Sequence, residues 1–153
     1  MPGRCSHSLE QRLGELLDKP STRDLASGLA KLVHELVLDL RPLAILLAGS
    51  LARGEFVRGM SDIDLLVLVD RPPGKWERFR LAHVGGVDVE ITVFGLEEAL
   101  EAAAGGNFFV REALEEGIVL YEAGGTGLSK LIKEALGQAR PREGAAGDGQ
   151  GGR

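Results

Sequence analysis

The sequence has little of what a cross-linked, secreted or membrane-spanning protein needs. Its 153 residues include a single cysteine, which excludes a disulfide within the chain and argues against a zinc site built on cysteines. No apolar run approaches the roughly 18 residues that a transmembrane helix requires. The first residues also lack the apolar segment of a secretory signal. These absences predict a protein of a reducing compartment, the cytoplasm by default.

The chain also lacks the positive charge of a protein that wraps nucleic acid. Lysine and arginine total 18 against 23 aspartates and glutamates, which gives a net charge of −5. Because phosphate backbones are bound mainly through lysine and arginine, we expect no extended nucleic-acid surface. This does not exclude a nucleotide or a chain end as the ligand. The hydrophobic content of 44% is ordinary for a globular domain with one core.

Hydrophobic periodicity divides the chain into helices and strands. Leucines at helical spacing predict a helix over residues 8–18 and a longer one that ends near residue 40. Short, continuous apolar runs at 43–49 and 62–70 predict buried strands, and two strand-like runs on either side of Gly85-Gly86 predict a β-hairpin. The remaining elements are three helices and one short strand, expected at 96–106, 107–117, 126–139 and 118–122.

We expect these elements to form an α/β (α+β) fold, a mixed β-sheet with helices mainly on one face. Strands 43–48, 63–69 and 87–94 should be adjacent in it. An N-terminal helical extension would occupy residues 1–20, and the main domain residues 21–139. The segment 140–153 contains no large apolar side chain, so it cannot recover the entropy lost on ordering, and a disordered tail is predicted there.

The stretch LAGSLARGEFVRGMSDIDLLV, residues 47–67, contains the residues that indicate chemistry. A strand ends at Gly49-Ser50, where glycine lets the backbone approach a ligand and serine adds a hydroxyl donor. Backbone N–H groups at the start of a following helix would point to the same place, which favours a phosphate. The alternative is an ordinary tight turn.

Asp62 and Asp64 lie two residues apart at the head of a strand, so their side chains point to one face. Neighbouring carboxylates repel each other, and such a pair needs a cation to stay ionised. Oxygen ligands favour Mg²⁺ or Mn²⁺. In the alternative interpretation, Ser61 and Asp62 only form a turn and Asp64 is a capping residue.

A later strand can supply a third carboxylate. Its apolar residues alternate with three polar ones, so two acids share a face: Asp88, Glu90 and Thr92. Beside Asp62 and Asp64 they would complete a two-metal site, in which one metal holds a triphosphate and the other lowers the pKa of an attacking hydroxyl. A solvated edge strand would show the same alternation.

Together these residues resemble the nucleotidyltransferase superfamily that includes the palm domain of DNA polymerase β, and in particular its minimal nucleotidyltransferase (MNT) domains. The shared pattern is Gly49-Ser50, then Asp62-x-Asp64, then an acid on a later strand. The closing segment VREALEEGIVLYE also follows it. One departure is the spacing between Ser50 and Asp62: there are 11 residues between them, about one more than in most minimal members, and the extra residue falls in 57–60. The resemblance implies a palm-like fold over roughly residues 25–122.

The resemblance also implies an activity: transfer of a nucleoside monophosphate from an NTP, usually ATP, to an acceptor hydroxyl, with release of pyrophosphate. Asp62 and Asp64 would hold both Mg²⁺ (or Mn²⁺) ions. Asp88 would hold the catalytic metal and help to deprotonate the acceptor. Glu90, two residues on, is the alternative third acid and would take or share that role.

By the same resemblance, Gly49 and Ser50 would bind the β- and γ-phosphates. Arg53 would reach a phosphate oxygen or, equally, form a surface ion pair. The acceptor is expected from outside the chain, from a helical HEPN-type partner in a toxin–antitoxin module or from a second copy. The competing hypothesis is a non-catalytic nucleotide-binding or partner-neutralising module, and the intact acids favour the enzyme.

Overall fold

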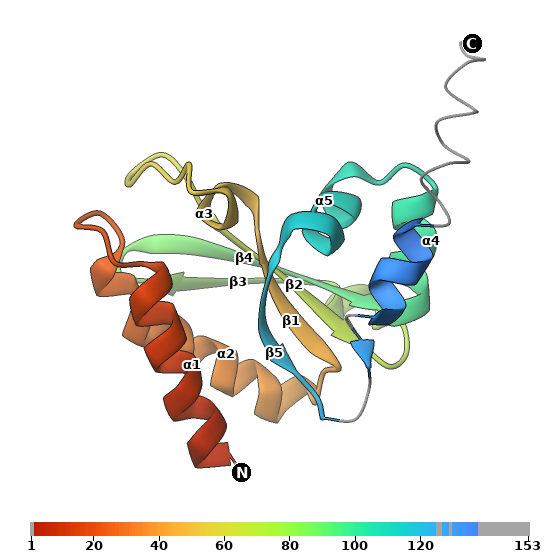
Figure 1. Cartoon of the computed structure of the whole chain (residues 1–153), viewed down its shortest axis with the longest axis horizontal. Helices are drawn as coiled ribbons and strands as arrows, with labels where there is room; N and C mark the ends of the chain where they lie inside the picture. Colours follow the sequence, from red (N-terminus) through yellow and green to blue (C-terminus); the bar gives the residue numbers. More distant parts are fainter. Residues whose placement is uncertain (1, 125–126, 129, 138–153) are drawn as a thin grey trace.

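A computed structural model of the chain describes residues 2–124, 127–128 and 130–137, with side chains from residue 9 onward. Its centre is a five-stranded sheet in the order β3-β4-β2-β1-β5 (Figure 1). β2 and β4 run parallel, and the other neighbouring pairs are antiparallel. The three strands predicted to be adjacent are adjacent. In chain order the strands are Ala44–Ala48, Ile63–Val69, Phe79–Val84, Val87–Gly95 and Ile118–Glu122.

Five helices have defined bounds: α1 to α5 span Pro2–Leu16, Ala26–Leu40, Gly49–Arg53, Leu96–Ala104 and Phe108–Glu116. Short 3₁₀ turns lie at Arg23–Leu25 and Lys75–Glu77. Residues 128 and 130–137 are also helical. The predicted helices and strands are therefore present, with bounds that differ by a few residues. The largest difference is α1, which begins at Pro2 rather than near residue 8.

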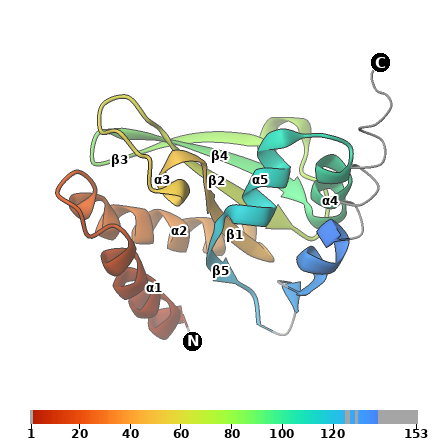
Figure 2. The same ribbon diagram turned by 45° about the horizontal axis from the view of Figure 1, so that its top comes forward.

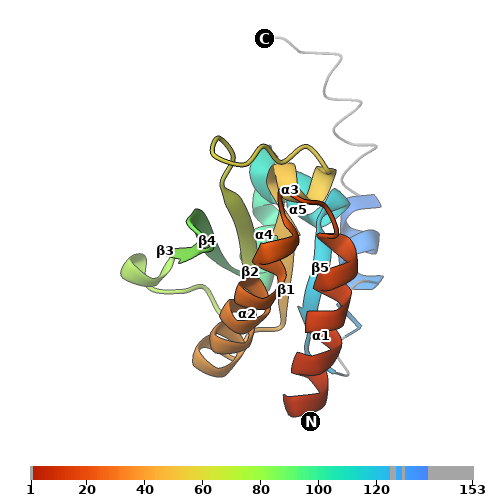
Figure 3. The same ribbon diagram turned by 90° about the vertical axis from the view of Figure 1, so that its left-hand side faces the viewer.

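The predicted α+β class with a mixed sheet is confirmed, but helices cover both faces of the sheet and not mainly one (Figures 2 and 3). α1 and α2 pack on one face, and α4, α5 and the helical residues near 132 pack on the other. The physical reason lies in β1 and the middle of β2, where every residue is buried. A continuous apolar strand must be covered on both of its faces.

α1 shares the core of the main domain. Its residues Leu9 and Leu13, with Leu17 just after it, belong to the cluster formed by α2 and one sheet face. The predicted disordered tail at 140–153 lies outside the described residues. In the part of the chain that the structure describes, no helix is long and apolar enough to cross a membrane.

The second sheet face is covered only in part. Leu66 and Leu68 of β2 and Phe94 of β4 pack against α4 and α5. At the other end of the same strands, this face carries Asp64 and Glu90, and it remains open to solvent. The fold therefore leaves one end of a well-packed sheet free, and the predicted site residues lie there.

Candidate active site

Acidic side chains gather where β2 and β4 begin. The parallel register pairs Asp64 directly with Glu90. Residues in register share a face of the sheet, and so do residues two apart on one strand, so Asp88 lies on that face as well. Asp62 precedes β2 and interacts with both Asp64 and Glu90. The structure thus brings together the two acids of the DxD motif and both candidates for the third acid.

The negative charges of these acidic side chains are only partly offset by positive charge nearby. Burial raises the pKa of Asp64, and the charge of Asp62 raises it further, while Arg53 and a hydrogen bond with Glu90 act in the opposite direction. The pKa of Glu90 is also raised, first by desolvation and then by Asp64, Asp62 and Asp88. Carboxylates whose pKa values are raised by one another are stabilised by a cation bound among them.

The chemistry of these donors fits a divalent metal ion, because Mg²⁺ and Mn²⁺ prefer carboxylate oxygens. The ligand geometry is not preformed. Across the described residues, no three histidine, cysteine, aspartate or glutamate side chains are arranged so that they could hold a metal ion together. Instead, the carboxyl group of Asp62 acts on the pKa values of Asp64 and Glu90, and those two carboxyl groups act on each other's.

The two candidates for the third acid have different partners. Asp88 pairs with His83 across the β3–β4 hairpin, and its Oδ1 lies 2.8 Å from Nδ1 of that histidine. Glu90 faces Asp64 instead. The sequence favoured Asp88 and kept Glu90 as the alternative, whereas the register places Glu90 in the more direct contact with the DxD motif. The sequence does not predict that His83 pairs with Asp88.

Gly49 lets the turn that follows β1 lie close to the acids. It begins α3 directly after β1, with a φ of 69° that L side chains rarely adopt. A Cβ atom at this position would lie 2.3 Å from Oδ2 of Asp64. Glycine is therefore required here both for its backbone conformation and for space. The backbone at Gly49 thus comes close to the side chain of Asp64, and its close approach to a ligand stays a prediction.

Ser50 follows in the first turn of α3 and is half-buried. Within the part of the chain that the structure describes, its hydroxyl group has no hydrogen-bond partner. The hydroxyl is therefore available to a ligand that lies beside Gly49.

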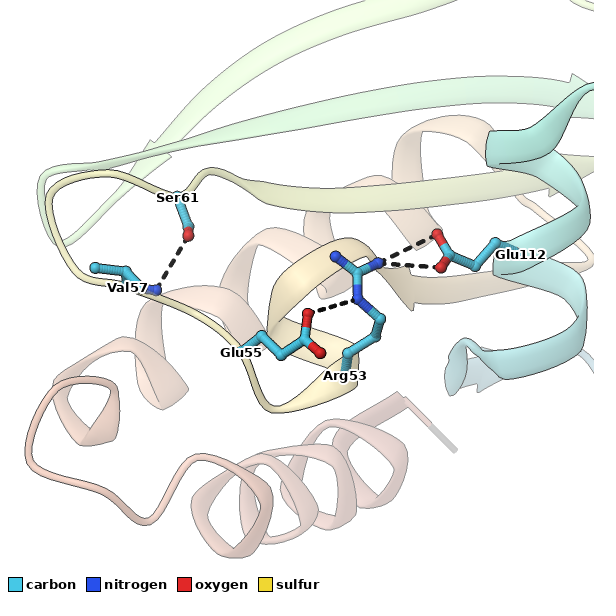
Figure 4. Close-up of polar contacts among 5 residues, drawn as sticks. All are labelled: Arg53, Glu55, Val57, Ser61 and Glu112. Carbon is cyan, nitrogen blue, oxygen red and sulfur yellow. Dashed lines mark hydrogen bonds and ion pairs between the residues drawn. The ribbon is translucent and has the colours of Figure 1, made fainter.

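Arg53, the last residue of α3, lies between two carboxylates (Figure 4). Its Nε donates to Oε1 of Glu55 at 3.0 Å, and its Nη1 donates to both carboxylate oxygens of Glu112 at 3.2 Å. These contacts raise the pKa of Arg53, and the hydrogen bond with Glu55 contributes most to the rise. Two roles were considered for Arg53, a contact with phosphate and an ion pair, and the ion pair is present. The charge of Arg53 also lowers the pKa of Asp64. Glu112 comes from α5, and the sequence gave no signal that it would meet Arg53.

The loop with the extra residue is held by a hydrogen bond within it and by contacts of Arg58 with two other segments. The backbone N–H of Val57 donates to Oγ of Ser61 at 3.0 Å (Figure 4). Arg58 forms a two-pronged ion pair with Asp24, at 2.8 and 3.0 Å, and donates to the carbonyl oxygen of Gly85 at 2.8 Å. The loop is thus tied to the segment before α2 and to the tip of the β3–β4 hairpin, beside the acids.

One comparison with known proteins gives a match. The family model described as a nucleotidyltransferase domain matches residues 27–120. This segment is more than half of the chain, runs from α2 into β5 and includes every predicted site residue. A search of the curated proteins finds no match.

Proposed function

The chain belongs to the nucleotidyltransferase domain family, and from this premise we propose that it transfers AMP from ATP, with Mg²⁺ or Mn²⁺, to the hydroxyl group of an acceptor. The enzyme class follows from the family. The nucleotide, the metal and the acceptor are the proposal. The observation that supports the proposal most is the direct pairing of Asp64 with Glu90 in the sheet. Glu90 also interacts with Asp62, and Asp64 lies close to the turn at Gly49.

Each residue of this group has a part in the proposal. The turn at Gly49 and the hydroxyl of Ser50 bind the β- and γ-phosphates. Asp62, Asp64 and Glu90 would hold the metal ions, which offset the charge of the triphosphate and lower the pKa of the attacking hydroxyl when bound. Arg53, held beside Asp64, adds positive charge to the phosphate side of the site.

The transfer itself is an in-line displacement at the α-phosphorus. The acceptor oxygen forms a bond to this phosphorus, and the bond from the phosphorus to the oxygen that bridges to the β-phosphate breaks. Pyrophosphate leaves with the electron pair of that bond. The hydroxyl proton passes to a carboxylate oxygen of Glu90, which lies opposite Asp64 in the register of β2 and β4.

Binding of ATP should require a divalent metal, and this tests the proposal. Without metal, the triphosphate meets the carboxylates of Asp62, Asp64 and Glu90, and like charges repel. Calorimetry with ATP in Mg²⁺ should give a saturable isotherm that disappears in excess EDTA. Equal affinity under the two conditions would contradict the metal site, and no binding in either would contradict the nucleotide site.

The third acid can be assigned by comparing two variants on the same strand. Glu90→Gln should lower the rate of transfer about 100-fold, because it removes the proton acceptor opposite Asp64. Asp88→Asn should lower it much less, because Asp88 is engaged with His83. The assay is transfer of label from α-labelled ATP. The reverse order of effects would restore Asp88 as the third acid.

Ser50→Ala should weaken ATP binding and leave the fold intact. A hydrogen bond to a charged phosphate contributes about 1.5–3 kcal/mol, so the dissociation constant for Mg²⁺–ATP should rise by about tenfold to a hundredfold. The melting temperature should stay close to that of the wild type, because the hydroxyl has no partner among the described residues. A large fall in melting temperature with unchanged affinity would instead make Ser50 a structural turn residue.

The source of the acceptor stays a prediction. A HEPN-type partner or a second copy follows from the family resemblance, and so does the competing hypothesis of a binding module without catalysis. A stable complex with a partner that is unaffected by Asp64→Asn, together with no transfer by the wild type, would favour the binding module.

A further inference from the structure

The open face of the sheet continues past the acids onto the edge strand β3. The antiparallel register pairs Leu81 with Glu90 and Phe79 with Thr92. Because residues in register share a face, Leu81 and Phe79 lie on the same face as the acids, one strand further out. Figure 3 shows the strand order, with β3 at one edge and β1 and β5 on the other side of β2 and β4.

Leu81 and Phe79 are exposed although the strand that carries them is well anchored. Their side chains are 62% and 69% exposed. Ala82, on the opposite face of β3, packs against the α2 side of the core, and Arg80 pairs with Asp39 of α2 at 2.6 Å. Large apolar side chains side by side on an open edge strand are costly for a soluble protein and mark binding surfaces. We call Phe79 and Leu81 the apolar face of β3.

The geometry of the proposed transfer reaction indicates from which side of the site the acceptor approaches. The turn at Gly49, where pyrophosphate would leave, follows β1, and the acids lie on β2 and β4. In an in-line displacement the attacking oxygen enters opposite the leaving group. The leaving group lies toward β1, so the acceptor must come from the side of β4 and β3. The apolar face of β3 lies on that side, next to Glu90.

The charges around this face do not suit an acceptor that carries phosphate. The basic residues of segment 78–84 are all engaged by acids. Arg78 pairs with Glu98, and His83 pairs with Asp88 at 2.8 Å. Arg80, paired with Asp39, belongs to the opposite face. The groups that remain beside Leu81 are acidic and apolar, so a polyanion would be repelled while an uncharged apolar group would be accommodated.

We infer that Phe79 and Leu81 form the acceptor subsite, and that the acceptor carries its hydroxyl on an apolar group without phosphate. This inference rests on the proposed transfer reaction. It makes the two residues determinants of specificity, because they hold the acceptor and take no part in the bond changes.

The experiment compares three acceptors with α-labelled ATP and Mg²⁺: 2-phenylethanol, ethanol at equal concentration, and an oligoribonucleotide with a free 3′ hydroxyl. We expect 2-phenylethanol to be labelled about tenfold faster than ethanol, because its ring gains contact with the apolar face. We also expect it to be labelled faster than the oligonucleotide. Faster labelling of the oligonucleotide, or equal labelling of the two alcohols, would overturn the inference and leave the proposed function standing.

Variants then connect the preference to the residues. Leu81→Ser should raise KM for 2-phenylethanol about tenfold, and its affinity for Mg²⁺–ATP by calorimetry should stay that of the wild type. Leu38→Ser is the matched control, because Leu38 is 61% exposed on α2 and lies outside the site; it should change neither quantity. An unchanged KM in Leu81→Ser would overturn the inference. If no acceptor is labelled and Mg²⁺–ATP does not bind to the wild type, the proposed function fails, and the inference fails with it.

Discussion

Replacing Asp64 with asparagine should lower the rate of transfer by about 1,000-fold or more, the largest effect we expect from any conservative change in this chain. Asp64 lies opposite Glu90, interacts with Asp62 and Arg53, and contacts the turn at Gly49. Its position therefore links the acids of β2 and β4 to the turn that follows β1. Asparagine keeps the size of the side chain but removes the charge that would bind the metal ions.

The same variant should be at least as stable as the wild type at neutral pH without ligands. The pKa of Asp64 is raised in the folded chain, first by burial and then by the charge of Asp62. A raised carboxyl pKa means that the folded state binds more protons than the unfolded state, so stability falls as the pH rises from the ordinary carboxyl pKa through the raised one. The asparagine side chain of the variant does not titrate and avoids this loss.

The transfer assay checks the expected fall in rate of Asp64→Asn, and thermal unfolding checks its expected stability. The stabilisation by Asp64→Asn should be present at pH 7 and shrink as the pH falls through the raised pKa of Asp64. Asp70→Asn is the control, because Asp70 is an exposed acid just past the other end of β2, and its substitution should change neither activity nor stability. A wild-type rate in Asp64→Asn would contradict the role of Asp64 in catalysis and favour a binding module.

The elements of this fold could be predicted because their patterns are local. The runs at 43–49 and 62–70 are continuously apolar, as strands buried on both faces must be. The same pattern also indicates that both faces are covered, and it therefore argues against helices mainly on one face. The adjacency of strands 43–48, 63–69 and 87–94 was predicted, whereas the order of all five strands was not.

The partners within the site could be predicted only in part. Alternation along 87–93 indicates that Asp88 and Glu90 share a face, but it does not give the register of β4 against β2, which decides which of them faces Asp64. Arg53 and Glu112 are 59 residues apart and meet because α3 and α5 pack near one end of the sheet. Contacts of this kind depend on tertiary packing, for which one sequence gives no local signal.

Gly49→Ala should lower both the stability of the fold and the rate of transfer. The matched variant Gly54→Ala separates these two effects. Gly49 and Gly54 flank the same short helix, α3, with φ values of 69° and 77°. An alanine at either position is strained by about 1–2 kcal/mol, because L side chains rarely adopt this conformation. Only at Gly49 would the new Cβ meet another group, Oδ2 of Asp64 at 2.3 Å, whereas Gly54 has no atom within 4 Å of that position.

The two variants should therefore lose similar stability from backbone strain but differ in activity. In Gly49→Ala the carboxylate of Asp64 must move away from the turn at Gly49, and a displacement of about 1 Å in a catalytic group can cost about 100-fold in rate. Gly54→Ala should keep most of its activity at a temperature where both variants are folded. The measurements are thermal unfolding and transfer from α-labelled ATP. Equal losses of activity in the two variants would mean that the contact between Gly49 and Asp64 does not set the geometry of the site, because strain in α3 alone would then explain the loss.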